Sequence, residues 1–299
     1  MTDSSLRDVH QSVLLEESVA MLQVVPGGVY MDGTFGLGGH TKEILRQSSP
    51  DGKVVAFDWD GEAIRLGLEN IGNHRNRLTI IHRNFREIEV GLQAAGYPVV
   101  DGILIDIGLS SLQLDSDGRG FSFRKDEALD MRMDRRRPLT AARVIAETPE
   151  KELADLFYYY GDEKQARRIA AHVVKTRSRQ RIETTGQLAE VVSAAVPKRF
   201  HPPKIHVATK VFQALRIAVN EELGNLGAIL DKAASHLRAG GRLCVISFHS
   251  LEDRIVKRSL NGNPELQVVT RKPIVPGDVE IQRNPRARSA RLRVAERTV

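Results

Sequence analysis

Three aspartates stand at the ends of short apolar stretches that are typical of β-strands. Asp32 follows GVYM, Asp58 follows KVVAF, and Asp106 follows GILI. In an open parallel sheet the carboxyl ends of the strands lie along one edge, and ligands bind at that edge. A group of carboxylates there suits a ligand with positive charge and hydroxyl groups, because carboxylates attract the charge and accept hydrogen bonds from the hydroxyls.

A glycine-rich loop follows the first of these strands, in the segment MDGTFGLGGH at residues 31–40. Its glycines are Gly33, Gly36, Gly38 and Gly39. A phosphate loop needs G-x-x-x-x-G-K-[ST], whereas this loop continues with His40 and Thr41. A dinucleotide fingerprint needs G-x-G-x-x-G, and the different register of these glycines disfavours NAD.

S-adenosylmethionine (SAM) matches this combination better than a ligand with phosphates does. An acid at the end of the second strand, Asp58, suits the ribose hydroxyls, and neighbouring carboxylates suit the ammonium and sulfonium groups. SAM has no phosphate, so it does not require a strict phosphate loop. The residues therefore predict SAM as the cofactor, with Asp32, Asp58, Asp106 and Gly36 among the residues that bind it.

The elements that position these residues follow an alternating order. Over the first hundred residues strand-like and helix-like stretches alternate strictly, which predicts a doubly wound parallel α/β sheet. After Asp115 the alternation stops, three amphipathic helices follow, and the α/β pattern then returns. We expect one α/β domain formed by residues 1–114 and 206–299, with a helical domain inserted at residues 115–205.

The inserted helical domain is expected to carry a basic surface. Its first clear helix is predicted to start with Thr148 as the N-cap and Pro149 at the first helical position. A second helix over about residues 162–177 places basic side chains on one face. They are Lys164, Arg168, His172 and Lys175. Residues 151–210 hold twelve Lys and Arg against six Asp and Glu.

The last stretch of the chain is also basic. From Gln282 onward it contains six arginines, and the whole chain has a net charge of +6. Arg291 and Arg293 alternate with Leu292 and Val294, which predicts a final strand with a basic face. Each basic patch is either a phosphate-binding surface or ordinary solvated surface, and an acidic partner would explain both.

Longer motifs carry a more specific resemblance. They are HQSVLLEESV, DGTFGLGGHT, LIDIGLSSLQLD, GFSF, LDMRMD, FQALRIAVNEEL, SFHSLEDRIVK and NPRARSARLR. Through them nearly the whole chain resembles the RsmH (MraW) family of bacterial 16S rRNA cytosine-N4 methyltransferases. The resemblance implies a class I SAM-dependent methyltransferase with a Rossmann-like sheet and an inserted helical domain. It also implies a methyl acceptor at N4 of a cytidine in the decoding region of the small ribosomal subunit.

The resemblance further assigns SAM contacts to positions of this chain. These are Gly38, Gly39 and His40 along the methionine part, Asp58 at the ribose, Phe85 beside the adenosine, and Asp106 and Gln113 after the fourth strand. One motif common in amino-methyltransferases, [DNS]-P-P-[YFW], does not follow that strand, where the chain reads Asp106-Ile107-Gly108-Leu109. The Pro-Pro pair in HPPK at 201–204 is interpreted as a domain-hinge turn.

Methyl transfer to an exocyclic amine requires alignment more than strong base catalysis. The lone pair of cytosine N4 is delocalised into the ring, and an acceptor aimed at its N–H bonds favours the pyramidal, reactive form. Asp106 is the expected acceptor. Ser110 and Ser111 in the following loop either contact the base or cap the turn.

The target base has to leave its stack to enter such a site. Phe121 and Phe123 either stack on it or pack in the core, and His249 either faces the substrate or makes a structural hydrogen bond. RNA phosphates are expected at the basic patches, which would make binding salt-dependent. The residues assigned to phosphates are Lys164, Arg168, Lys175, Arg286 and Arg288.

Other functions fit the sequence less well. We find no membrane span and no secretory signal, so a cytoplasmic protein is expected. We expect Cys244 to be a buried core thiol, and the Cys, His and acidic residues predict no metal site. SFHSLEDR lacks the G-x-S-x-G elbow of hydrolases. A nicotinamide oxidoreductase, identified by NAD binding without SAM binding, and a non-catalytic RNA-binding module, identified by binding neither, remain as alternatives. The oligomeric state, monomer or homodimer, is open.

Overall fold

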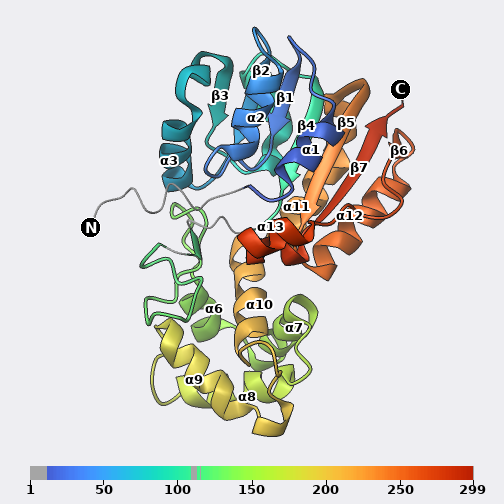
Figure 1. Ribbon diagram of the computed structural model, residues 1–299. Coiled ribbons are helices and arrows are strands. Elements are labelled where there is room, and N and C mark those ends of the chain that lie inside the picture. The colour runs from blue at the N-terminus through green and yellow to red at the C-terminus, as the bar shows by residue number, and fades with distance from the viewer. Residues whose placement is uncertain (1–11, 109–112, 115, 299) are drawn as a thin grey trace. The chain divides into compact units, whose positions relative to one another are not determined.

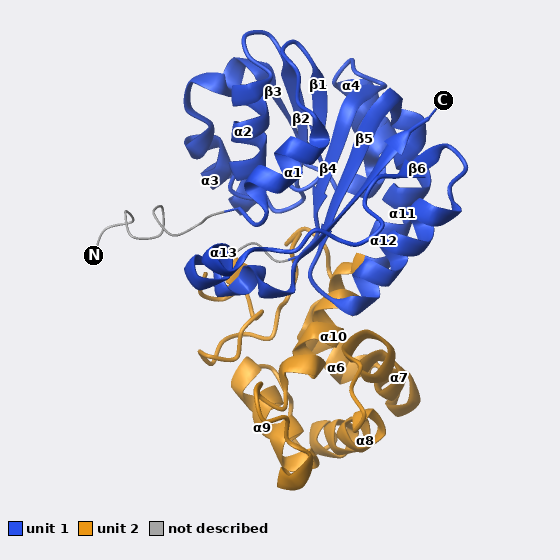
Figure 2. Cartoon of the chain, turned by 45° about the vertical axis from the view of Figure 1, so that its right-hand side comes forward, with its two compact units in different colours: residues 1–110, 223–299 blue, residues 111–222 orange. Residues whose placement is uncertain are grey.

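The chain folds into two compact units in this computed structural model, which describes residues 12–108, 113–114 and 116–298. The α/β unit comprises residues 1–110 and 223–299, and the helical unit comprises residues 111–222 (Figure 2). The second boundary lies after residue 222 rather than at the expected residue 205. Helical periodicity shows that a segment is a helix, but it does not show which core the apolar face of that helix joins.

A single seven-stranded sheet organises the α/β unit (Figure 1). Its strands are β1 Val29–Asp32, β2 Lys53–Phe57, β3 Leu78–Ile81, β4 Val100–Asp106, β5 Leu237–Ser247, β6 Leu266–Val268 and β7 Arg291–Arg297. The order across the sheet is β3-β2-β1-β4-β5-β7-β6, with β1 to β5 parallel and β7 antiparallel to both of its neighbours. The strand order reverses between β1 and β4, which makes the crevice at their carboxyl ends a binding site by topology. This sheet confirms the predicted doubly wound fold.

Helices cover both faces of this sheet. They are α1 Leu15–Leu22, α2 Gly39–Gln47, α3 Gly61–Ile71, α4 Ile88–Ala94, α11 Glu222–Ala233 and α12 Ser250–Gly262. The unit also contains α13 Asp278–Arg283, which has no buried residue. Alternate strand residues enter different cores: Val55 and Phe57 pack with α4, α11 and α12, whereas Val54 and Ala56 pack with α1, α2 and α3. Because the sheet is buried on both faces, its central strands β1 and β2 are apolar without alternation.

The helical unit contains five described α-helices. They are α6 Ala141–Glu147, α7 Glu150–Gly161, α8 Ala166–Arg177, α9 Thr185–Ala195 and α10 Thr209–Asn220. Pro149 takes the N-cap position of α7, one residue later than the expected Thr148, and α8 begins after Lys164 rather than before it. Leu153, Phe157 and Ile169 form part of the buried interior of the helical unit.

Short 3-10 helices connect several of these elements. They are η1 Gly72–Arg77, η2 Phe85–Glu87, η3 Lys198–Phe200, η4 Ala234–His236 and η5 Pro285–Ser289. Among the helices in the described part of the chain, none is both long and apolar enough to cross a membrane.

The basic face predicted for the last strand is wrong. Leu292 and Val294 are buried as expected, but Arg293 is also buried, at 7% exposure. Its guanidinium donates two hydrogen bonds to Asp253 of α12, at 2.6 and 3.2 Å, and Arg291 donates a third at 3.0 Å. A partner 40 residues away in the sequence converts Arg293, an expected surface arginine, into a member of a buried ion pair, whereas Arg291 stays exposed.

We expect Asp253→Asn to lower the free energy of unfolding of the α/β unit by about 3 kcal/mol, because it leaves the Arg293 charge buried without a counter-ion. Urea denaturation followed by Trp59 fluorescence reports on this unit, since Trp59 is the only tryptophan. Glu69→Gln, which removes an exposed partner of Arg65, should cost less than about 1 kcal/mol.

The effect of Asp253 should depend on pH. Burial opposes ionisation of Asp253, but its hydrogen bonds from Arg293 and Arg291 outweigh burial and lower its pKa. The stabilisation is therefore present at neutral pH and is lost as the pH falls through the lowered pKa. If Asp253→Asn lowers the free energy of unfolding by less than about 1 kcal/mol at pH 7, the ion pair with Arg293 is not what stabilises β7.

Candidate functional site

The first strand-end acid, Asp32, is buried in a fixed orientation at the end of β1. Its side chain is 1% exposed. Oδ1 accepts a hydrogen bond from the Thr34 amide at 3.0 Å, and Oδ2 accepts one from the Thr41 hydroxyl at 2.6 Å. Burial raises the pKa of Asp32, while the nearby His40 and these hydrogen bonds oppose the rise. Asp32 thus fixes the backbone at the end of β1, and its negative charge raises the pKa of Asp58 and of Asp106.

The second acid, Asp58, ties the end of β2 to the glycine loop. Oδ2 accepts from the Gly36 amide at 2.8 Å, and Oδ1 accepts from the Asp60 amide at 2.9 Å. Each carboxylate oxygen keeps a second lone pair for a ligand hydroxyl. Burial raises the pKa of Asp58 to about 7, the two amide bonds oppose the rise, and the charges of Asp60 and Asp32 add to it. Near neutral pH the carboxyl therefore titrates.

The third acid, Asp106, ends β4 directly beside β1. Its amide donates to the Thr34 hydroxyl at 2.7 Å, so Thr34 links the two strand ends. Its Oδ1 is buried and has no hydrogen-bond partner among the residues that the structure describes. Burial raises the pKa of Asp106 well above the ordinary value, and the charges of Asp32 and Glu252 raise it further. A buried carboxyl oxygen without a donor is costly until a positive or hydrogen-bonding group reaches it.

The glycine loop turns sharply above these acids and leads into α2. Gly38 has φ +80° and is the N-cap of α2. A Cβ at this position would lie 3.2 Å from the Gly67 carbonyl and 3.1 Å from Ile71. The chain therefore needs glycine both for the left-handed backbone and for the close packing on α3. The first turn of α2 offers amide groups that suit a ligand carboxylate.

The predicted SAM residues of the α/β unit lie together at this edge. Besides the three acids they are Gly36, Gly38, Gly39, His40 and Phe85. Phe85 begins η2 after β3. A Cβ added to Gly33 would lie 3.5 Å from the Cβ of Phe85, so the Phe85 side chain starts beside the first residues of the glycine loop. His40 is only 5% exposed, with Nδ1 3.9 Å from Asp106 Oδ2. This set of carboxylates, amides and an aromatic ring fits SAM.

Three other candidates cannot be added to this group. Ser110 and Ser111 lie outside the described residues. Gln113 is buried and belongs to the helical unit. Their roles remain predictions.

His249 has a structural position at the start of α12. Its Nδ1 accepts a hydrogen bond from the Glu252 amide at 3.4 Å, and its Nε2 lies 2.9 Å from the Glu252 carboxylate. Glu252 is fully buried and accepts in turn from the amides of Phe248 and His249. The structural hydrogen bond considered for His249 is therefore present. Sequence reasoning missed Glu252, because the capping-box signature has Ser or Thr at the N-cap and His249 takes that position here.

Phe121 and Phe123 both pack within the helical unit. Phe121 is buried, and the Arg119 guanidinium lies 5.8 Å from its ring centroid. Phe123 packs edge-on against Phe212 at 4.8 Å and beside His206 at 4.8 Å. The packing alternative thus holds for both rings in this structure.

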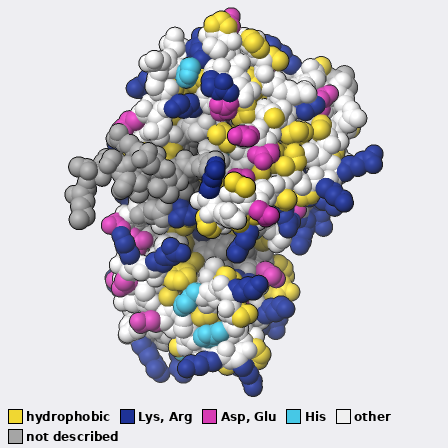
Figure 3. Space-filling view, viewed as in Figure 1, with side chains coloured by type: hydrophobic (Ala, Val, Ile, Leu, Met, Phe, Trp, Pro, Cys, Tyr) yellow, Lys and Arg dark blue, Asp and Glu magenta, His cyan; other side chains and the backbone are white. Residues whose placement is uncertain are grey.

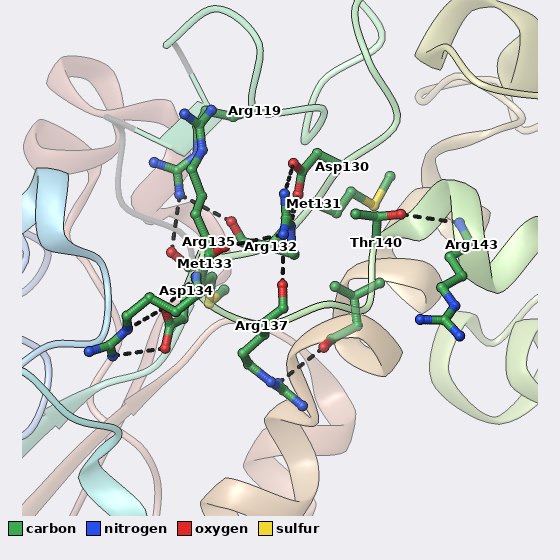
Figure 4. A network of polar contacts seen from close by, with 12 residues as sticks. Arg119, Asp130, Met131, Arg132, Met133, Asp134, Arg135, Arg137, Thr140 and Arg143 are labelled. Atoms are coloured by element: carbon green, nitrogen blue, oxygen red, sulfur yellow. Dashed lines mark hydrogen bonds and ion pairs between the residues drawn. The ribbon is translucent and has the colours of Figure 1, made fainter.

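A network of arginines and aspartates holds the segment between these rings and α6 (Figure 4). Arg132 forms two hydrogen bonds with Asp130, both 2.8 Å long, and donates to the Arg137 carbonyl at 2.6 Å. Asn220 of α10 accepts from the Met133 amide and donates to the Met131 carbonyl. The motif LDMRMD was recognised only through the resemblance, and its residue types alone gave no sign that these groups bond to one another.

The predicted phosphate contacts are exposed. Lys164, Arg168 and Lys175 are exposed on the helical unit, and Arg286 and Arg288 are exposed on η5. In the space-filling view Lys and Arg side chains are numerous on the lower part of the face shown, where the helical unit is drawn (Figure 3). Exposure makes contact with RNA possible, and that contact remains a prediction.

The sequence model of the MraW methylase family matches residues 7–298. The chain belongs to this family. A protein named "Ribosomal RNA small subunit methyltransferase H" from Desulfotalea psychrophila is 60% identical over 289 residues, which cover 97% of this chain and 98% of that protein. A protein of the same name from Nostoc punctiforme is 48% identical and covers 97% of this chain and 94% of its own length.

Solved structures include more distant matches. Fibrillarin from Aeropyrum pernix with natively bound SAM has a TM-score of 0.43 at 10% identity, covering 94% of this chain and 74% of that chain. Family membership and the names of the two relatives make the chain a SAM-dependent methyltransferase, and its sheet has the class I order, as predicted. This sets aside the oxidoreductase and the non-catalytic module.

Two further expectations concern side chains away from the edge of the sheet. Cys244 is buried in β5, and burial raises the pKa of its thiol to about 12, so it is a core residue. Over the described ranges no group of three or more His, Cys, Asp or Glu side chains is arranged to hold a metal ion.

We expect SAM to bind more tightly as the pH rises through about 7, because the ribose hydroxyls donate to the ionised form of Asp58. With a pKa of about 7, the share of binding that depends on Asp58 should weaken about ten-fold between pH 8 and pH 6. Asp58→Asn should weaken binding at pH 8 by at least about ten-fold and remove this share of the pH dependence. Calorimetric titration with SAM measures both. An unchanged pH profile in the variant would exclude Asp58 as the ribose acid.

Proposed function

We propose that this enzyme methylates N4 of a cytidine in the decoding region of 16S rRNA, within the small ribosomal subunit. Two relatives of nearly the same length carry a name that specifies small-subunit rRNA methylation, which supports the substrate class. The choice of cytosine N4 rests on the family resemblance. The structural observation that supports it best is the buried Asp106 Oδ1 at the strand-order reversal, an acceptor without a donor among the described residues. Since ribosomal subunits are its substrate, we place the enzyme in the cytoplasm.

Bound SAM supplies an electrophilic methyl group on a sulfonium. The residues of this chain must hold the acceptor amine in line with that group and accept hydrogen bonds from its N–H bonds. A carboxylate at Asp106 can accept such a hydrogen bond. Accepting a hydrogen bond from the N–H group draws the amine nitrogen toward a pyramidal geometry with an available lone pair. Asp32 and Thr34 fix the place of Asp106 through the linked strand ends.

Ser110 and Ser111 remain candidates for contact with the base, because they closely follow the strand that carries Asp106. The exposed Lys164, Arg168 and Lys175 of the helical unit, with Arg286 and Arg288 of η5, are proposed to contact phosphates of the RNA. Phosphate contacts position the RNA and carry no sequence information, so selection of the cytidine depends on the site itself.

Asp106→Asn should lower the rate of methyl transfer at saturating SAM by at least about 100-fold, since the amide is a weaker acceptor and cannot take a proton. Labelled SAM, small subunits from cells that lack this gene and mass analysis of digested rRNA give the rate and the product. Asp231→Asn, on the exposed side of α11, is the matched control and should retain full activity. A label on any nucleoside other than N4-methylcytidine would overturn the proposed acceptor.

The double charge reversal Arg168→Glu with Lys175→Glu should weaken binding to small subunits by at least about ten-fold near 0.1 M salt. The slope of log affinity against log salt should fall by about 1 to 2, because two phosphate contacts are lost. The affinity for SAM should not change. Lys151→Glu on α7 alters a charge elsewhere on the same unit and is the control. An equal effect of the control would assign the loss to overall charge and not to α8.

A further inference from the structure

His40 is a buried imidazole in contact with the segment that precedes α1. Its Nε2 lies 3.1 Å from the Val13 carbonyl oxygen. A carbonyl oxygen only accepts hydrogen bonds, so in the neutral ring the hydrogen is on Nε2. The other nitrogen, Nδ1, therefore carries a free lone pair and can accept a proton.

Nδ1 is also the His40 nitrogen that lies near Asp106. Nδ1 of His40 lies 3.9 Å from Asp106 Oδ2, which is longer than a hydrogen bond but is bridged by a shift of about 1 Å or by one water. Other charged groups act on the pair from each neighbouring element. They are Asp32 from β1, which acts on both, and Glu252 from α12, which acts on Asp106.

In the protein without SAM the electrostatics favour a neutral imidazole and a protonated carboxyl. Burial lowers the pKa of His40, although the charge of Asp32 and the bond to Val13 oppose this, which favours the neutral ring. Burial raises the pKa of Asp106 well above its usual value, and the charges of Asp32 and Glu252 add to the rise, which favours the protonated carboxyl. A cation beside Asp106 would favour the ionised carboxylate and so displace that proton.

We propose that the Asp106 carboxyl holds one proton in the protein without SAM, that Nδ1 of His40 receives this proton when SAM binds, and that Asp106 regains a proton from the methylated acceptor after methyl transfer. His40 is thus a positioning residue that acts through Asp106 and sets its charge for the reaction. The first half of the proposal concerns SAM binding alone, and the second half rests on the proposed methyl transfer.

The proton balance of the second half is complete without another reactant. Once the acceptor nitrogen has gained the methyl group it carries a positive charge and must lose one hydrogen. Asp106 takes that hydrogen as a proton: the N–H bond breaks, its electron pair stays on nitrogen, and an O–H bond forms. Asp106 thereby returns to its protonated form, and His40 then gives the proton that it has held since SAM bound to solvent.

The first test counts protons by calorimetry and needs no RNA. Binding of SAM at pH 7 is measured in several buffers, and the slope of the binding enthalpy against the buffer ionisation enthalpy gives the protons released. His40→Gln keeps an N–H group for the Val13 carbonyl and lacks the basic nitrogen. It should release about one more proton to the buffer per SAM bound than the unchanged protein does, because the proton from Asp106 has no acceptor inside the site.

Further variants decide whether that proton comes from Asp106. In the double variant His40→Gln with Asp106→Asn the additional release should disappear. His40→Asn places an amide near Asp106 but loses the Val13 contact, so it should reproduce the additional release if the basic nitrogen is what matters. Thermal melting of each variant verifies that it is folded. Equal release from the unchanged protein and both His40 variants would overturn the proposal.

The second test uses the pH profile of methyl transfer at saturating SAM. His40→Gln should lower kcat by at least about ten-fold at pH 7 and by less at pH 9, where hydroxide and buffer remove the proton from Asp106 directly. A loss that is the same at both pH values would mean that His40 only shapes the loop. Failure of rRNA methylation altogether would leave the calorimetric result standing, so the two proposals can fail separately.

Discussion

The repulsion among buried carboxylates at the carboxyl edge of the sheet is the constraint on which the site depends. Asp32 and Glu252 lie close enough to Asp106 for their charges to raise its pKa, and the charge of Asp32 also raises the pKa of Asp58. Such a cluster is unfavourable while every member is ionised in a low-dielectric interior. The fold tolerates it because Asp58 and Asp106 bind protons far above the ordinary pKa, and because most of the oxygens accept backbone or hydroxyl hydrogen bonds.

The surrounding backbone is organised around those hydrogen bonds. Thr34 uses its amide for Asp32 and its hydroxyl for the amide of Asp106, which holds β1 and β4 in register at the point where the strand order reverses. Asp58 performs the same task for the glycine loop through the amide of Gly36. The acids predicted to bind the ligand are therefore structural groups as well. Replacing one of them changes the shape of the loop as well as the charge of the site.

Much of this arrangement could be predicted from local sequence. An acid after each of three apolar stretches, together with the parallel alternation of strands and helices, was enough to place Asp32, Asp58 and Asp106 on one edge. Contacts between distant segments could not be predicted in this way. The pairing of Arg293 with Asp253 joins residues 40 positions apart, and periodicity treated Arg293 as a surface residue. The membership of α10 in the helical unit and the packing of Phe123 on Phe212 depend on tertiary contacts for the same reason.

The proposed reaction has to handle two positive charges in sequence, first on the bound cofactor and then on the methylated amine. A site of permanently ionised carboxylates would attract both, but it would carry the full cost of mutual repulsion in their absence. Carboxyls that gain and lose protons avoid this cost, because each proton neutralises one charge until a cation replaces it. The separation of 3.9 Å between Asp106 Oδ2 and Nδ1 of the buried His40 imidazole allows such a proton exchange within the protein in our proposal. The raised pKa values at the edge of this sheet are thus a functional property of the site: they allow one group of side chains to remain stable without a ligand and to bind a cation tightly.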